Sequence, residues 1–188
     1  MTQDSALDTT ISESSMTAGE VETLRFVLDR SRAQFAWKVG GLDAAALRRP
    51  HPPSAMTLGG LIKHVALNED YTTAAKLRGQ PLGAPWDGAD FDADPDWEWH
   101  TAADDSPEEL YRLWRDAVER SRAAVDAVLA EGDGGLDQPA KFQTGSGESP
   151  NIRRVLVDLF EHYMRHVGHA DVLREAIDGL VGEDPPQP

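Results

Sequence analysis

Apolar residues recur at helical spacing in four long segments of this 188-residue chain, and no segment shows the strict alternation of a half-buried strand. The predicted helices span residues 19–38, 57–77, 106–130 and 149–178. Helices that carry one apolar stripe, with no sheet to cover, must bury their stripes against one another. The sequence therefore predicts an all-α fold, a four-helix bundle with long connections that is either antiparallel or contains a crossover.

Capping signals mark the ends of several of these helices. Thr17 and Glu20 fit a capping box at the start of the first helix. Ser106, which precedes a proline and two acids, is predicted to cap the third helix. Ser149 marks the predicted start of the last helix, and Gly179 marks its end.

The connection formed by residues 79–105 is rich in Pro, Gly and Asp, but it also carries the large side chains Trp86, Phe91, Trp97 and Trp99. Connections of this length in a compact domain are usually functional or disordered. Because large aromatic rings gain free energy from burial, we expect this connection to pack across the bundle.

One domain accounts for a chain of this length. We place the bundle at residues 18–180, because apolar periodicity is confined to that range. Residues 1–17 and 181–188 are predicted to be flexible N-terminal and C-terminal tails.

Composition excludes several classes of function. The 33 acidic and 18 basic residues give a formal net charge of −15, which disfavours binding to nucleic acid or to an anionic membrane surface. The chain has no cysteine, so disulfides, thiolate metal ligands and a cysteine nucleophile are excluded. Neither a transmembrane run of roughly 18–20 apolar residues nor a secretory signal is recognisable. We therefore expect a cytoplasmic protein, either a monomer or a homodimer.

The last predicted helix carries three histidines on its apolar face. With a rotation of about 100° per residue, one stripe of this helix contains Val155, Leu159, His162, His166, His169 and Leu173. Burying an imidazole without partners costs on the order of 1–3 kcal/mol, so three buried imidazoles need an explanation.

A divalent cation provides that explanation. His162 and His166 lie one helical turn apart, so both imidazoles can reach the same ion. His64 is the predicted third ligand, because it lies within an apolar stretch of the second helix, whereas His51 and His100 lie in polar loops. Three ligands leave the ion an open position, as in catalytic sites. Zn is the predicted metal, and Ni, Fe and Mn are the alternatives.

Two questions stay open at this point. His169, one turn beyond His166, fits a fourth ligand, a donor to a ligating histidine or a proton carrier. The histidines also fit a purely structural interpretation, as neutral core side chains that hydrogen-bond to their neighbours.

The histidine segments resemble those of the DinB/YfiT-like superfamily of metalloenzymes. That superfamily pairs an L-x-x-H element on the second helix with HxxxH on the last helix, and this chain has Leu61-Ile-Lys-His64 and Glu161-His-Tyr-Met-Arg-His-Val-Gly-His-Ala-Asp-Val-Leu-Arg-Glu175. An additional histidine, frequent in the superfamily, matches His169. The resemblance extends over residues 20–179 and is closest to an actinobacterial subgroup, from which His162 departs because glutamate is common there.

This resemblance implies a DinB/YfiT-like bundle and a small-molecule enzyme. The activities it implies are mycothiol-dependent S-transfer and maleylpyruvate-type isomerisation, with mycothiol, bacillithiol or another low-molecular-weight thiol activated at the metal. The same site would alternatively activate water for hydrolysis. A different class of function is a metal-binding or ligand-binding module without turnover, associated with stress. No residue is assigned a direct catalytic role.

Side chains near the predicted ligands are candidates for the surrounding pocket, namely Asn68, Tyr71, Arg165, Trp97 and Trp99. Arg165 either holds a substrate carboxylate or forms a salt bridge on the helix surface. The two tryptophans either roof the metal cavity or cover the end of the bundle, and we expect the second. Glu69 and Glu161 are candidate hydrogen-bond partners of the ligands.

Overall fold

The computed structural model describes residues 7–187 and confirms the all-α prediction, since no strand occurs in that range. Its long helices are α1 (Glu20–Val39), α3 (Leu58–Asp70), α5 (Pro107–Ala130) and α6 (Ile152–Asp178). A π-helical segment, Tyr71–Leu77, continues α3 to the residue where the sequence predicts its end. The first six residues of the predicted N-terminal tail, and Pro188, lie outside the described residues.

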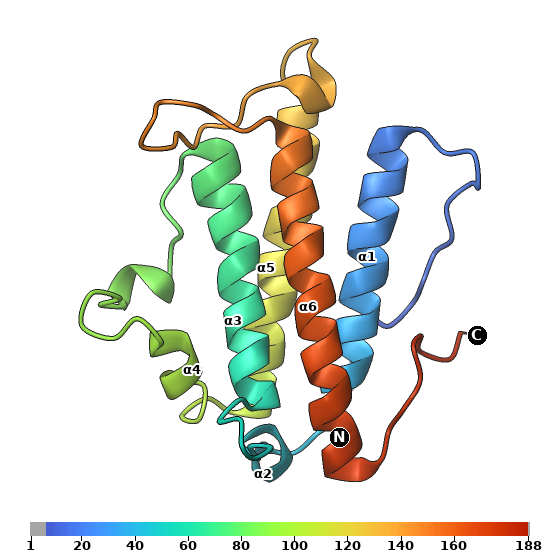
Figure 1. Ribbon diagram of the computed structural model, residues 1–188, viewed down its shortest axis with the longest axis vertical. Coiled ribbons are helices and arrows are strands. Elements are labelled where there is room, and N and C mark those ends of the chain that lie inside the picture. The colour runs from blue at the N-terminus through green and yellow to red at the C-terminus, as the bar shows by residue number, and fades with distance from the viewer. Residues whose placement is uncertain (1–6, 188) are drawn as a thin grey trace.

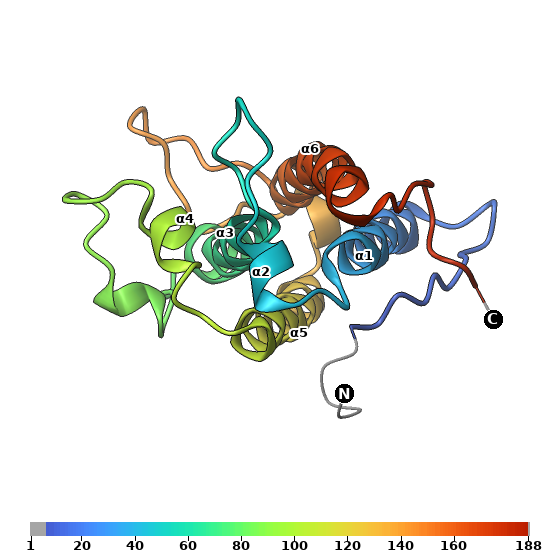
Figure 2. The same cartoon turned by 90° about the horizontal axis from the view of Figure 1, so that it is seen from below.

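The long helices form a bundle in which α1 packs on α6, and α3 packs on both α5 and α6 (Figure 2). Helices α3 and α5 run in the same direction (Figure 1). The chain must therefore return along the outside of the bundle between them. The structure thus selects the crossover over the antiparallel arrangement, and this return explains the length of the connection at residues 79–105.

This crossover connection is anchored to the bundle near both of its ends. Trp86 is 2 % exposed and donates its Nε1–H to Asp70 Oδ2 at 2.8 Å. At the other end, Lys63 Nζ lies 2.6 Å from Asp105 Oδ2. The short helix α4 (Trp97–Thr101) lies between these anchors and packs on α3. The prediction that the connection packs across the bundle is confirmed.

Short helices escape sequence-based prediction here. Neither α2 (Ala44–Leu47) nor α4 is expected from the sequence, because four or five residues hold too few apolar positions to establish a period. The start of α2 instead depends on one local contact, in which the side chain of Asp43 accepts the N–H of Ala46.

The predicted cap of α1 is wrong, whereas that of α5 is confirmed. Gly19 is the N-cap of α1, and the Thr17 hydroxyl lies against Ser15 instead of the helix. At α5 the hydroxyl of Ser106 accepts the N–H of Glu109, whose carboxylate accepts the N–H of Ser106 in return.

The predicted start of α6 is also wrong by two residues. Asn151 is its N-cap and accepts the N–H of Arg154 at 2.9 Å. The helix cannot begin at Ser149, because the carbonyl of Pro150 is held in an extended pairing with the N–H of Ala140. The end at Gly179, with φ of 79°, is as predicted.

The described part of the C-terminal segment lies along α1. Arg30 and Asp184 form an ion pair at 2.6 Å, and Lys38 donates to the carbonyl of Gly182 at 2.7 Å. The flexibility of both tails and the domain limits stay predictions. Among residues 7–187, none of the helices combines the length and apolar character required of a transmembrane span.

A buried polar network joins all the long helices in the middle of the bundle. Glu69 on α3 is 0 % exposed and accepts two hydrogen bonds from Arg32 on α1, at 2.7 and 2.9 Å. It also accepts a hydrogen bond at 2.6 Å from Tyr163 on α6, whose hydroxyl accepts the Nε1–H of Trp114 on α5. Because Tyr163 follows His162 directly, this network fixes the position of α6 relative to α3.

Candidate metal centre

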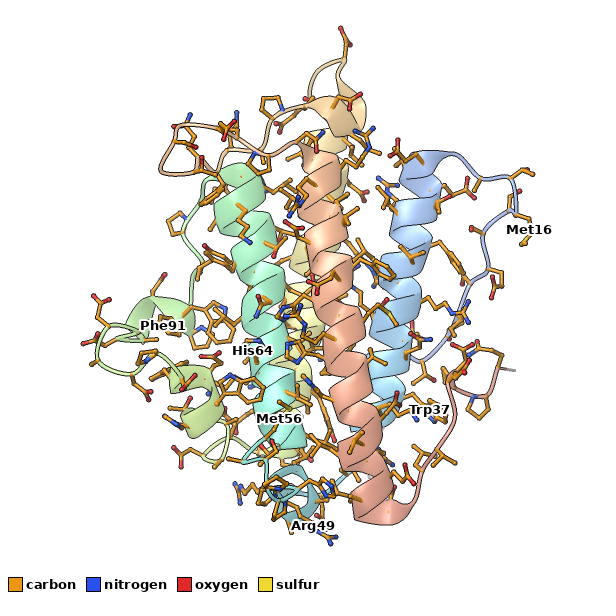
Figure 3. All side chains as sticks on the ribbon, in the orientation of Figure 1. Met16, Trp37, Arg49, Met56, His64 and Phe91 are labelled. Carbon is orange, nitrogen blue, oxygen red and sulfur yellow. The ribbon has the colours of Figure 1, made fainter. Side chains whose placement is uncertain are left out.

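Three imidazoles from two helices meet in one cluster. The ring of His64 on α3 lies 5.1 Å from that of His162 and 4.8 Å from that of His166, both on α6, and the latter two rings are 4.4 Å apart. One nitrogen from each ring can be chosen so that all three nitrogens lie within 4.8 Å of one another. Figure 3 labels His64 on α3. These three side chains, the ones predicted from the sequence, could hold a metal ion.

Local helix geometry explains how each side chain reaches the cluster. His162 and His166 are four residues apart on α6, so they project from the same face on successive turns. His64 lies on α3, whose start is fixed by the Thr57 hydroxyl, which accepts the N–H of Gly60 at 3.0 Å. The contact between α3 and α6 then brings the two sets together.

The cluster has the electronic properties that a cation requires of its ligands. Burial, followed by the charges of His64, Arg165 and Lys76, lowers the pKa of His162 to about 4. Burial and the neighbouring His162 and His64 likewise lower the pKa of His166 to about 3. Both rings are therefore neutral near pH 7 and have a lone pair available. The Nε2 atom of His162 is buried and has no hydrogen-bond partner among residues 7–187, so these residues fit a bound cation.

These lowered pKa values predict that the metal-free protein loses stability in mild acid. The unfolded histidines take up protons near pH 6.5, whereas folded His162 and His166 do not until about pH 4 and 3. The unfolded state binds more protons in between, so this contribution is full above pH 6.5 and declines as the pH falls below it. We expect a loss of about 2–3 kcal/mol in the free energy of unfolding between pH 7 and pH 5.5, about half of it from each histidine.

Urea unfolding with a chelator present, at both pH values, measures this loss. His162→Gln removes one of the groups, so the variant should lose less stability than the parent protein over the same range. His51→Gln is the matched control, because His51 is an exposed loop residue outside the cluster. If the free energy of unfolding fell equally with pH in the parent protein and in His162→Gln, the loss could not be assigned to the lowered pKa of His162.

The site also contains a carboxylate that sequence reasoning missed. Oε1 of Glu98 on α4 lies 2.8 Å from Nδ1 of His64. The candidates Glu69 and Glu161 are engaged elsewhere, the first with Arg32 and the second with Arg165. The signal available in the sequence was the position of Glu98 between two tryptophans.

The remaining candidates divide into those beside the cluster and those away from it. Nδ1 of His169 lies 3.3 Å from Nδ1 of His166, and Nδ2 of Asn68 lies 3.3 Å from Nε2 of His64. The indole of Trp99 stacks on His64 with the ring centroids 4.7 Å apart. For Trp99 the structure thus favours contact with the histidines over coverage of the bundle end.

Three predicted pocket residues make their principal contacts elsewhere. Trp97 packs edge-on against Trp86 and Phe91. Tyr71 is 40 % exposed and lies under the ammonium group of Lys76. Arg165 forms a surface ion pair with Glu161, the second of the alternatives considered for it.

Behind Trp99 lies a cavity of about 430 Å³. Its lining combines apolar and polar side chains, among them Leu47, Met56, Ala102, Arg48 and His100. This volume is within the usual range for a small-molecule site. Trp99 lines this cavity and also stacks on His64, so this side chain contacts both the cavity and the histidine cluster.

Comparison with known families gives one finding for most of the chain. The family model described as Mycothiol-S-transferase matches residues 23–179, a range that includes all the long helices except the first turn of α1. A comparison with curated proteins gives no match.

Proposed function

The chain belongs to the mycothiol-S-transferase family of the DinB/YfiT-like superfamily, and we propose that it is a metal-dependent thiol S-transferase with a cation held by His64, His162 and His166. Mycothiol or a related low-molecular-weight thiol is the proposed co-substrate, and a small electrophile is the acceptor. The observation that carries this proposal is the convergence of three imidazoles, one of which has a buried nitrogen without a partner among the described residues.

The donor set is compatible with several metals. Three neutral imidazoles suit Zn, and they also suit Ni, Fe and Mn. We propose Zn as the metal that these three side chains would hold. When bound, a divalent cation lowers the pKa of a coordinated thiol and supplies a thiolate near neutral pH.

Polar side chains beside the cluster support the proposed ligand set. We assign His169 the role of hydrogen-bonding to His166, which fixes the orientation of that ring.

The cavity behind Trp99 is the proposed binding place for the acceptor. Its apolar wall, formed in part by Leu47 and Met56, suits an apolar electrophile, and Arg48 offers a polar contact at its edge. The acceptor would lie on one side of Trp99 and the thiol on the side of the histidines.

A thiol screen tests this function. Zn²⁺-loaded protein is incubated with a chromogenic aryl halide and with mycothiol, bacillithiol or glutathione in turn, and conjugate formation is measured. We expect conjugation with mycothiol above the uncatalysed rate, loss of this activity after chelation, and its recovery when Zn²⁺ is returned. A positive result that persists after chelation would contradict the role of the metal.

Absence of turnover with all three thiols would overturn the transferase proposal. Such a result would favour the alternative of a metal-binding or ligand-binding module without turnover. Isomerisation and hydrolysis are alternative reactions at the same site, and each would need an assay with its own substrate. The cytoplasmic location and the choice between monomer and homodimer stay predictions.

A further inference from the structure

Glu98 reaches the histidine cluster from outside the bundle, on the five-residue helix α4 of the crossover connection. The residue is 4 % exposed. Its Oε1 atom lies 2.8 Å from Nδ1 of His64, whereas Oε2 is buried without a hydrogen-bond partner among residues 7–187. This carboxylate is therefore desolvated while part of its hydrogen-bonding capacity is unused.

The contact determines which nitrogen of His64 is available to a cation. A neutral imidazole has one N–H donor and one lone pair, and a carboxylate accepts a hydrogen bond. Glu98 therefore selects the form in which Nδ1 of His64 carries the proton and donates it to Oε1. The lone pair is then on Nε2, which faces the Asn68 amide nitrogen at 3.3 Å, so Glu98 favours the form of the ring that can bind a metal at Nε2.

The same short helix also fixes the plane of the His64 ring. Trp99 stacks on this ring with an interplanar angle of 28°. Its indole approaches α3 closely because residue 60 is glycine, where a Cβ atom would lie only 2.6 Å from Cε3 of Trp99. Helix α4 thus holds His64 through a hydrogen bond at the ring edge and a stacking contact on the ring face.

Electrostatics make this contact stronger when a cation is present. A positive ion on Nε2 withdraws electron density from the ring, and Nδ1–H becomes a better donor to the carboxylate. The ion also compensates the negative charge of Glu98, a buried group with incomplete partners. Both effects stabilise α4 against α3, so metal binding and docking of α4 favour each other reciprocally.

We propose that Glu98 is a positioning residue that orients His64 for the cation, and that cation binding in turn secures α4 on the bundle. This inference rests on the proposed function, because it requires a metal at the histidine cluster. It assigns the crossover connection a role in setting the metal affinity. Neither the family match nor the spacing of the histidines assigns that role.

The chain contains a matched control for this contact. Asp94 and His100 lie in the same connection and form the same type of pair, with 2.9 Å between Asp94 Oδ2 and Nδ1 of His100. Their side chains are 37 % and 66 % exposed, and neither residue belongs to the histidine cluster. Asp94→Asn therefore makes the same chemical change as Glu98→Gln, but away from the site.

The test compares Zn²⁺ affinities, measured by competition with a chromophoric chelator, for the full-length protein and these two variants. We expect Glu98→Gln to weaken Zn²⁺ binding by about 10–100-fold, as is typical when a hydrogen-bond partner of a metal ligand is lost, and Asp94→Asn to leave it unchanged. The visible spectrum of bound Co²⁺ should change in Glu98→Gln alone, since it reports ligand geometry.

Stability of the metal-free protein distinguishes positioning from a purely structural role. Glu98→Gln removes a buried carboxylate that has a hydrogen-bond partner for only one of its oxygens among the described residues. The melting temperature of the metal-free variant should therefore equal or exceed that of the parent protein. A lower melting temperature with unaltered Zn²⁺ affinity would overturn the inference and leave the proposed metal site intact. Failure of the parent protein to bind Zn²⁺ would instead contradict the proposed function itself.

Hydrogen exchange tests the reciprocal half of the inference. Zn²⁺ should slow amide exchange in residues 97–101 of the parent protein and of Asp94→Asn, and the effect should be smaller in Glu98→Gln. Equal protection of this segment with and without Zn²⁺ in the parent protein, at saturating metal, would contradict the coupling.

Discussion

Replacing His166 with alanine is expected to weaken Zn²⁺ binding by more than about 100-fold, beyond the loss caused by removing a partner of a ligand. The His166 ring is within 5 Å of both other rings of the cluster, at 4.8 Å from His64 and 4.4 Å from His162. The variant keeps two imidazoles, which are too few to compete with water and buffer for the ion. Metal content after dialysis and the shift of melting temperature on adding Zn²⁺ measure this effect.

The shift in melting temperature on adding Zn²⁺ distinguishes a loss of metal binding from a general loss of stability. A ligand that binds only the folded state, at about 100 times its dissociation constant, adds about 2.7 kcal/mol to stability, and this gain should vanish in His166→Ala. His100→Ala is the matched control, because this histidine is exposed in the crossover connection. Unchanged metal content in His166→Ala would show that the ligands have been misassigned.

Replacing Glu69 with alanine is expected to destabilise the bundle by about 3–5 kcal/mol. The substitution leaves the guanidinium of Arg32 buried without the carboxylate that accepts two of its hydrogen bonds. It also leaves the Tyr163 hydroxyl without its acceptor, and burial keeps that hydroxyl a donor by raising its pKa well above the ordinary value. A loss of this size is a large part of the stability of an ordinary domain.

Urea unfolding of the metal-free protein measures this loss, with Glu161→Ala as the control. Glu161 also pairs with an arginine, but that pair is on the surface and its loss should cost less than about 0.5 kcal/mol. If Glu69→Ala does not fold, Tyr163→Phe provides a milder change that removes one hydroxyl and should cost about 1–3 kcal/mol. A surface ion pair contributes about 0.5 kcal/mol to the free energy of unfolding. If Glu69→Ala and Tyr163→Phe both lose no more than that, the buried network does not have the importance assigned to it.

Spacing along the sequence was sufficient to predict the three histidines that the structure brings together, because each inference concerned residues of the same helix. His162 and His166 are four residues apart, and rigid helical geometry places such a pair on one face regardless of the rest of the fold. His64 was identified by its apolar surroundings, because only a buried position could meet the other two. The proposed function depends on these residues together with the family match.

The carboxylate that contacts the histidine cluster could not be predicted in the same way. Glu98 lies 34 positions after its partner His64, and the two meet because the crossover returns along α3. Glu69 and Glu161 were reasonable candidates from their nearness in sequence, but ion pairs with Arg32 and Arg165 are available to them in the folded chain. Sequence distance carries no information about such choices.

The amino-acid sequence alone determined the four long helices, their apolar faces and the imidazoles on those faces, since these properties follow from the regular geometry of each helix. Tertiary structure alone decided that α3 and α5 run in the same direction, that Glu98 and Trp99 lie against His64, and that Glu69 lies in the core with Arg32. Each of these contacts joins segments far apart in the chain. Their positions result from the packing of the whole bundle, in which many weak contacts act together. A local sequence pattern therefore cannot predict them.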